Sequence, residues 1–350
     1  MKLLNTLLLL TFLLAGYNSQ AMLVEKQLFE IKSFKTENGA LINPVKVGWE
    51  AYGTLNTDKS NVILITHFFS GSSHAAGKYS EADAAPGYWD AIIGPGKAID
   101  TNKYYVISVD TLVNANVFDP NVITTGPATI NPATGKPYGL SFPVVTIGDF
   151  VEVQKALLDS LGVDKLHAVV GGSMGSFQAI EWATRYPERV ERLIPVIGTA
   201  YIDAWAAVRL ERWAYPIKQD PAPYTDQAPH QDILASFSAW DQLMAHAKVR
   251  AKMQDANHIL YLIRASQLYR AGMGDNWQQA LSRVQANTLF LPASGDQLLL
   301  PHMAKTSVEA MKAAGKTVEY AEIPGIWGHL DGVVGISAVA DTIRKFLETE

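Results

Sequence analysis

The chain has 350 residues, of which 48% are hydrophobic and 18% are charged, and its formal net charge is -5. This composition predicts a sizeable buried core and excludes a disordered chain, and without a dense lysine and arginine cluster a nucleic-acid partner is not expected. The absence of cysteine excludes disulfides and thiol catalysis, and it suits an oxidising compartment.

The first residues have the pattern of a secretory signal peptide. Lys2 supplies the positive start, Leu3–Leu14 is mostly apolar, and Ser19 and Ala21 fit the small-residue rule for cleavage after Ala21. The apolar stretch is shorter than the ~20 residues that span a bilayer, and a buried N-terminal helix is the alternative. We therefore expect residues 1–21 to be removed, which leaves an exported protein, periplasmic or secreted, without a stable membrane anchor.

Strand and helix patterns alternate after this segment. Extended segments are predicted at Gln27–Phe34 and Pro44–Tyr52, with a turn at Glu37–Gly39 between them. Short apolar runs predict buried strands at Val62–Thr66, Tyr104–Val109 and Leu166–Val170, and further strands are predicted at Val190–Ile197, Thr288–Pro292 and Thr317–Ile323. Helical spacing predicts helices at Asp149–Leu161, Gly175–Tyr186, His302–Ala314 and Val334–Leu347. The alternation predicts an α/β protein with a mostly parallel sheet and helices on both faces.

Two segments depart from this alternation. Asn114–Phe142 is rich in proline, glycine, asparagine and threonine, which predicts a long loop. Tyr201–Leu281 has helical spacing and no strand pattern, so we interpret it as a helical lid over the sheet. The expected organisation is a core in two parts, 22–199 and 284–350, separated by a lid over 200–283.

The pattern G-x-S-x-G occurs at Gly171–Gly175, between a predicted buried strand and a predicted helix. In that context the serine stands on a sharp, strained turn, and glycines at its flanks let the backbone pass close by. The turn lifts the hydroxyl of Ser173 above the carboxyl ends of the strands, and the helix N-terminus favours a developing negative charge. The alternative is a plain glycine turn in which Ser173 only caps the helix.

A serine nucleophile needs a base and an orienting acid, which follow it in the order acid, histidine in this type of sheet. Asp296 comes after the predicted strand Thr288–Pro292, and His329 comes after Thr317–Ile323, so order and placement both fit. The alternatives are a helix-capping turn carboxylate and a loop histidine without a catalytic role. Asp331 could compete as the acid, although its position two residues from the histidine makes the geometry awkward.

The oxyanion formed during acyl transfer needs two backbone N–H donors. The first is expected at Met174, directly after the serine, and the second on the loop THFFSGSSH, at Phe69 or alternatively at Phe68. His67 and His74 flank this loop and are interpreted as hydrogen bonders that organise it. Metal-ligand and nucleotide-binding patterns are absent from the sequence, so neither a metal nor a cofactor is expected.

Several further stretches resemble the homoserine O-acetyltransferase family of α/β-hydrolase-fold enzymes. They span nearly the whole chain after the signal pattern and read AYGTLN, IGPGKAID, TGPATINPATGKPYG, FPVVTI, VVGGSMG, QAIEWATRYPERV and DANHILYLIRA. The resemblance implies that Ser173, Asp296 and His329 form the catalytic triad. It also implies that the lid covers an active-site tunnel and forms a homodimer contact. Members of the family take an acyl group from acetyl-CoA and pass it to the hydroxyl of homoserine, and some members are instead esterases.

Three departures from the family pattern concern the acceptor site. The family has an aspartate directly after the triad histidine, where this chain has Leu330. It has a carboxylate-binding arginine in the first lid helix, where our register gives Leu210, with Arg209 and Arg212 nearby. A glycine-rich stretch of the family is replaced by Leu112–Asp119. These changes remove charge from the acceptor site, and each lost charge-assisted contact costs roughly 1.5–3 kcal/mol of binding.

We therefore expect an exported serine esterase that acts on a small-molecule ester or acyl donor. An exported enzyme lacks access to cytoplasmic acetyl-CoA but always meets water, so hydrolysis of the acyl-serine is favoured. Homoserine O-acetyltransferase is the second hypothesis. A non-catalytic binding protein on the same scaffold is the third, and the intact serine, aspartate and histidine argue against it.

Overall fold

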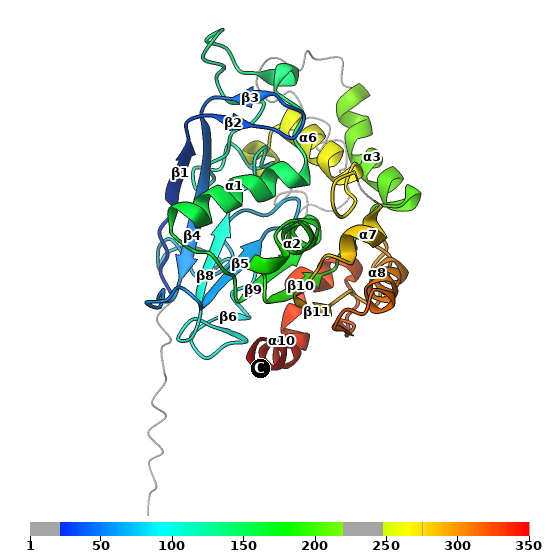
Figure 1. Cartoon of the computed structure of the whole chain (residues 1–350). Coiled ribbons are helices and arrows are strands. Elements are labelled where there is room, and N and C mark those ends of the chain that lie inside the picture. The colour runs from blue at the N-terminus through cyan, green and yellow to red at the C-terminus, as the bar shows by residue number, and fades with distance from the viewer. Residues whose placement is uncertain (1–21, 220–247, 275, 350) are drawn as a thin grey trace, which may run out of the picture.

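The computed structural model describes residues 22–219, 248–274 and 276–349 (Figure 1). Its centre is an eight-stranded sheet with the order β1-β4-β8-β5-β9-β10-β11-β12. The six strands from β8 to β12 in this order run parallel, and β1 and β4 join that sheet as an antiparallel edge. The predicted signal peptide and the middle of the predicted lid lie outside the described residues.

The strands of the large sheet are β1 (Gln27–Ile31), β4 (Val45–Tyr52), β5 (Val62–Thr66), β8 (Tyr105–Val109), β9 (Ala168–Gly172), β10 (Arg192–Val196), β11 (Asn287–Phe290) and β12 (Val318–Tyr320). Two short pairs lie outside it, β2 (Phe34–Lys35) with β3 (Leu41–Ile42), and β6 (Ile93–Gly94) with β7 (Ile99–Asp100). The β2–β3 hairpin contains the turn predicted at Glu37–Gly39. All six predicted strands of the parallel part are present, with ends that differ by up to three residues from the predicted ones.

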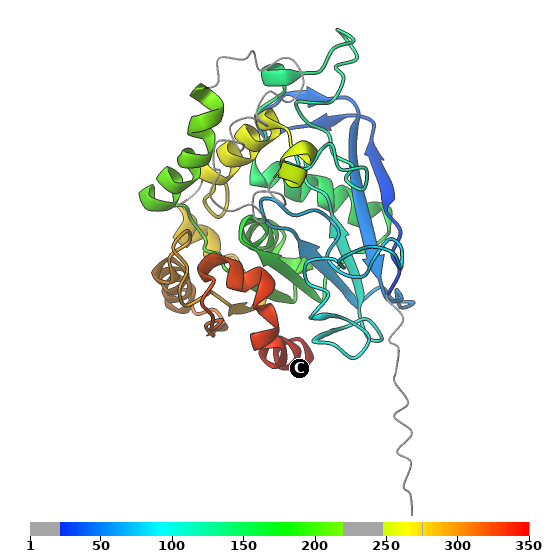
Figure 2. The ribbon, with the colours of Figure 1, turned by 180° about the vertical axis from the view of Figure 1, so that it is seen from behind.

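Helices cover both faces of the sheet, as predicted. They are α1 (Ile147–Ser160), α2 (Met174–Arg185), α3 (Ala204–Gln219), α6 (Ala256–Gln267), α7 (Trp277–Leu281), α8 (Pro301–Ala313), α9 (Asp331–Val334) and α10 (Ala340–Glu348), with short 3-10 turns η1 (Gly139–Ser141), η2 (Pro187–Arg189), η3 (Gly328–Leu330) and η4 (Ile336–Val339). Figure 1 shows α1 and α2 against one face, and Figure 2 shows the C-terminal segment with α10 against the other.

The position of β5 inside the sheet explains why its first four residues are all apolar. All five of its residues are buried. Val62 and Leu64 belong to the core on the α1 and α2 side, whereas Ile63 and Ile65 belong to the core that includes α10. Alternate side chains of a strand point to opposite faces, so a strand covered on both faces needs apolar residues at every position.

The predicted helix Val334–Leu347 is wrong in part, because the chain is broken there into α9, η4 and α10. The break falls at Gly335, a residue type that weakens helices, and a Cβ at this position would lie 2.9 Å from the Asp331 carbonyl oxygen. The break lets α9 present Val333 to a cavity while α10 packs against the sheet.

Helices α3 and α6 pack against each other above the sheet in both views (Figures 1 and 2). They lie in the described part of the predicted lid, which also includes α7. Within the described ranges, no helix combines the length and apolarity that crossing a membrane requires.

Candidate functional site

The turn between β9 and α2 has the strained geometry predicted for the serine. Ser173 has φ 54° and ψ -119°, a conformation that costs a non-glycine residue on the order of 1–3 kcal/mol. A Cβ on Gly175 would overlap the Thr66 carbonyl, and a Cβ on Gly171 would overlap Gly175. Ser173 occupies the N-cap position of α2, but its side chain makes no capping hydrogen bond. The interpretation of Ser173 as a helix cap is therefore wrong.

The hydroxyl of Ser173 is paired with a histidine instead. Nε2 of His329 lies 2.8 Å from the Ser173 Oγ, and its Nδ1 lies 2.6 Å from the Oδ2 of Asp296. Because a carboxylate only accepts hydrogen bonds, this network assigns the proton to Nδ1 and leaves Nε2 as an acceptor for the serine O–H. The three side chains form the serine–histidine–aspartate chain of contacts that the sequence predicted.

Asp296 is held by the turn on which it stands. It is 1% exposed, and its second carboxylate oxygen accepts hydrogen bonds from the N–H groups of Leu298 (2.8 Å) and Leu299 (3.0 Å). The turn role that we considered as an alternative is thus present together with the contact to His329. Backbone donors fix the carboxylate, and the carboxylate fixes the imidazole.

Asp331 has a different task from the one considered for it. Its carboxylate accepts a hydrogen bond from the Trp327 N–H at 3.0 Å, and a Cβ on Gly325 would overlap the same carboxylate. Asp331 therefore braces the loop that carries His329, and the acid that contacts the imidazole is Asp296.

Met174 and Phe69, the residues of the two predicted oxyanion donors, line the same cavity as the serine. Met174 is the first residue of α2, where an N–H group has no acceptor within the helix. Phe68, Phe69 and Met174 line the cavity together with Ser173 and His329. Phe69 also contacts Trp213 of α3 edge to face at 5.4 Å between ring centroids, which joins the loop to the described part of the lid.

The cavity has a volume of about 1070 Å³ and is lined mainly by apolar side chains. All three predicted substrate-contact residues, Arg209, Arg212 and Leu330, line it. Leu330 is 54% exposed, and it directly follows the histidine. Leu210 is buried in a small cluster with Ala214 and Ile263. The guanidinium of Arg209 lies 5.4 Å from the centre of the Trp205 ring. Among residues 22–219, 248–274 and 276–349, no group of three histidine or acidic side chains could hold a metal ion.

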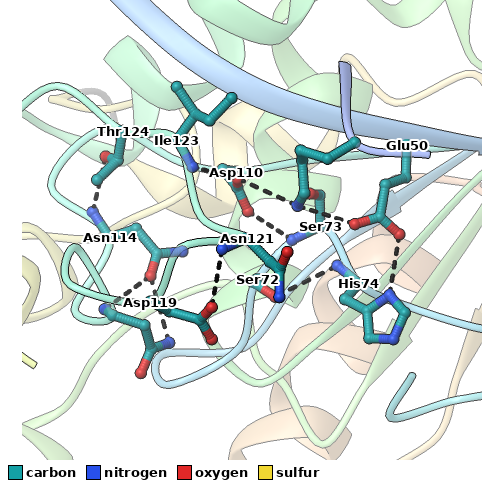
Figure 3. A network of polar contacts seen from close by, with 12 residues as sticks. Glu50, Ser72, Ser73, His74, Asp110, Asn114, Asp119, Asn121, Ile123 and Thr124 are labelled. Atoms are coloured by element: carbon teal, nitrogen blue, oxygen red, sulfur yellow. Dashed lines mark hydrogen bonds and ion pairs between the residues drawn. The ribbon is translucent and has the colours of Figure 1, made fainter. Parts of the chain in front are cut away.

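Sequence reasoning missed a buried ionic network beside the loop of Phe69. Lys26 lies between two carboxylates, with its Nζ 2.8 Å from Glu50 Oε1 and 3.4 Å from Asp110 Oδ2. It also donates to the hydroxyl of Ser73, and the Ser73 N–H donates to Asp110 at 2.6 Å (Figure 3). His74 lies 3.1 Å from Glu50. The one signal available for this network was Glu50, an acidic residue between Trp49 and Ala51 in strand β4.

The charged form of Glu50 is stabilised in the folded protein. Burial alone raises the pKa of this carboxyl, but the hydrogen bond from His74, the charge and hydrogen bond of Lys26, and the hydrogen bond from Tyr79 outweigh burial and lower it to about 2. In the folded protein the Glu50 carboxylate therefore stays ionised at pH values at which a glutamate is ordinarily protonated.

The sequence is similar to known proteins over nearly its whole length. Residues 62–324 match the alpha/beta hydrolase fold family. The homoserine O-acetyltransferase of Geobacter sulfurreducens is 35% identical over 366 aligned positions, which cover 93% of this chain and 97% of the relative. The chain belongs to the homoserine O-acetyltransferase family of α/β hydrolases. The fold and the family resemblance predicted from sequence are thereby confirmed.

Solved structures of this family and its neighbours include both transferases and esterases. The crystal structure of esterase E22 is 50% identical with a TM-score of 0.88, and the match covers 93% of this chain and all of that one (100%). The homoserine O-acetyltransferase from Bacillus anthracis is 36% identical with a TM-score of 0.88, covering 94% of this chain and 99% of that one. Membership of the family therefore leaves the acyl acceptor open.

Acid should weaken the folded protein through Glu50. Because the folded pKa is about 2 and the usual value is 4.5, its stabilisation is present above pH 4.5 and is lost as pH falls towards 2. Between pH 5 and pH 3 this single group accounts for about 2 kcal/mol of unfolding free energy. Urea unfolding should show that the free energy of unfolding falls between pH 5 and pH 3 by about 2 kcal/mol less in Glu50→Gln than in the unsubstituted protein. The exposed Glu30→Gln serves as the control, and equal losses in all three proteins would contradict the assignment.

Proposed function

We propose that this protein is an exported serine esterase that works through an acyl-serine intermediate at Ser173. The observation that carries the proposal is the pair of hydrogen bonds from Ser173 to His329 and from His329 to Asp296, at the wall of a large apolar cavity. A nucleophile, a base and an orienting acid in contact are the requirements of acyl transfer.

In the first half-reaction, the Ser173 oxygen attacks the ester carbonyl carbon while its proton passes to Nε2 of His329. The carbonyl oxygen becomes an oxyanion, which the N–H groups of Met174 and Phe69 bind. When the tetrahedral intermediate collapses, the bond to the alcohol oxygen breaks and His329 gives its proton to the leaving alcohol. Asp296 keeps the imidazole in the required tautomer and orientation throughout.

In the second half-reaction, a water molecule gives a proton to His329 and attacks the acyl-serine. The carboxylic acid leaves, and the proton returns to the serine oxygen. A transferase differs only in this step, because the hydroxyl of an acceptor replaces water. The choice between hydrolysis and transfer therefore depends on whether the cavity binds an acceptor.

The residues near His329 favour water. Leu330 follows the histidine, and Leu330 and Leu210 both line the cavity, with Leu210 also packed between the lid helices α3 and α6. Homoserine is a zwitterion, and desolvating its charges against leucine side chains without compensating partners is costly. The 50% identity to esterase E22, against 36% to the Bacillus anthracis transferase, supports the same conclusion.

Homoserine O-acetyltransferase with acetyl-CoA is the second candidate. The curated relatives carry that name, and Arg209 and Arg212 line the cavity with their positive charges. A non-catalytic binding protein would have no need for the strained serine and its paired histidine.

The proposed export rests on the N-terminal pattern. Cleavage after Ala21 would make Met22 the first residue of the mature chain. The Met22 carbonyl accepts a hydrogen bond from the Lys78 N–H at 2.9 Å, so the new end of the chain would be held against the body of the protein.

Expression of the full chain in a bacterial host should yield a processed protein in the periplasm or medium. We expect its intact mass to correspond to a chain that starts at Met22. Replacing two of the four leucines Leu7–Leu10 with arginine should keep the unprocessed chain inside the cell, because a charged segment no longer serves as the apolar part of a signal. A full-length chain in the cytoplasm of the unsubstituted strain would refute export.

Replacement of the nucleophile tests the catalytic assignment. Ser173→Ala should lower kcat for p-nitrophenyl acetate by at least ~10³-fold and abolish fluorophosphonate labelling, because no acyl-serine can form. The circular dichroism spectrum should not change, since only a hydroxyl is removed. Ser160→Ala, on the exposed end of α1, is the control and should keep full activity. Near-full turnover in Ser173→Ala would show that another residue is the nucleophile.

The acceptor is tested by product analysis. With acetyl-CoA and homoserine in excess, we expect little O-acetylhomoserine, and with short activated esters we expect efficient hydrolysis. Formation of O-acetylhomoserine with kcat/KM above ~10⁴ M⁻¹s⁻¹, an ordinary value for a dedicated substrate, would establish the transferase instead. Leu330→Asp should raise transfer relative to hydrolysis at least ~10-fold, because one charge-assisted contact is worth about 1.5–3 kcal/mol. Leu330→Asn has the same size without the charge and should show a smaller gain.

A further inference from the structure

One peptide plane decides whether Phe69 can serve as an oxyanion donor. The peptide between Phe68 and Phe69 is trans, so the Phe68 carbonyl and the Phe69 N–H point in opposite directions. The carbonyl contacts two donors, the His67 Nδ1 at 2.7 Å and the Gly71 N–H at 2.9 Å. With the carbonyl held on that side, the Phe69 N–H is directed to the other side, and it donates no hydrogen bond to the described part of the chain.

His67 is itself held rigidly. It is fully buried, and its Nε2 accepts a hydrogen bond from the Thr111 N–H at 3.1 Å. An acceptor at Nε2 places the proton of the neutral ring on Nδ1, which then donates to the Phe68 carbonyl. Burial also lowers the pKa of this histidine, against the smaller opposing effects of the Phe68 carbonyl and Asp110. The ring is therefore a fixed neutral connector and takes no part in the proton transfer at Ser173.

The rest of the loop is tied to the segment after β8. The side-chain amide of Asn114 donates to the Gly71 carbonyl at 3.0 Å, and that of Asn116 donates to the Ser70 carbonyl at 3.1 Å. Asp110 accepts from the Ser73 N–H, as Figure 3 shows. Asn114 and Asn116 thus tie the segment that follows β8 to the loop that carries Phe69.

We infer that His67 is a positioning residue for acyl transfer, which sets the 68–69 peptide so that the Phe69 N–H faces the oxyanion. The inference rests on the proposed function, since an oxyanion forms only during acyl transfer. This role can be told apart from a contribution of His67 to stability, because an oxyanion donor binds the tetrahedral intermediate and not the bound ester. Loss of His67 should therefore affect kcat and leave KM nearly unchanged.

The decisive variant is His67→Leu, which removes both ring contacts. We expect kcat for p-nitrophenyl acetate to fall by about 10²–10³-fold, as when one oxyanion donor is lost, with KM changed by less than about 3-fold. A trifluoromethyl ketone, which adds to the serine and forms an oxyanion, should bind more weakly by a similar factor. The corresponding methyl ketone, which serves as a mimic of the bound ester, should keep its affinity.

Two further variants separate positioning from folding. His67→Asn keeps a donor at the place of Nδ1 and should recover at least ~10-fold of the lost kcat. His167→Leu removes a histidine that bonds the Leu347 carbonyl far from the cavity, and it should not change the ratio of the two ketone affinities. If His67→Leu does not fold, Asn116→Ala tests the same loop, with an expected loss of about 10-fold in kcat and in trifluoromethyl ketone affinity.

Two results would overturn the inference. One is unchanged kcat in the folded His67→Leu protein, or in Asn116→Ala where His67→Leu does not fold. The other is an equal loss of affinity for both ketones, which would mean that His67 only shapes the cavity. Failure of the proposed function looks different, because the unsubstituted protein would then show no hydrolysis that depends on Ser173.

Discussion

The close backbone approach between Gly175 and Thr66 is the constraint on which the site depends. The Thr66 hydroxyl donates to the Gly175 carbonyl at 2.7 Å, and any side chain on Gly175 would overlap the Thr66 carbonyl. This contact joins the end of β5 to the start of α2. Because the loop of Phe69 begins directly after Thr66 and the serine stands directly before α2, one contact brings the nucleophile and both proposed oxyanion donors together.

The other half of the site depends on two loops that meet at glycines. Asp296 follows β11, and His329 lies beyond β12, the last strand of the sheet. Gly328 has φ 60° and lies against the carbonyl of Gly295, which a Cβ at Gly328 would approach to 2.9 Å. The two loops can therefore approach closely enough for the 2.6 Å contact between the carboxylate and the imidazole. Short loops at adjacent parallel strands give the acid and base a rigid mounting.

Sequence predicted the fold and the serine, histidine and aspartate well, because the serine and the aspartate follow apolar strands, the histidine follows the next strand in chain order, and the glycines have a specific steric cause. It failed where local pattern does not determine the outcome. The helix predicted over Val334–Leu347 has continuous helical spacing, but it bends at Gly335 to serve two separate faces. The network of Lys26, Glu50 and Asp110 depends on β4 pairing with β8, and periodicity does not reveal which strands are neighbours.

The span of the serine–histidine contact has a consequence for the folding chain. The two residues are 156 positions apart in sequence, and contacts of such separation form late because closing the intervening loop costs entropy. The elbow around Ser173 needs only β5, β9 and α2, all complete before residue 186. An intermediate that contains this part alone carries a serine with no base, and an unassisted hydroxyl is a weak nucleophile. The serine therefore gains its base only when the segment beyond β12, the last strand of the sheet, has packed against the elbow.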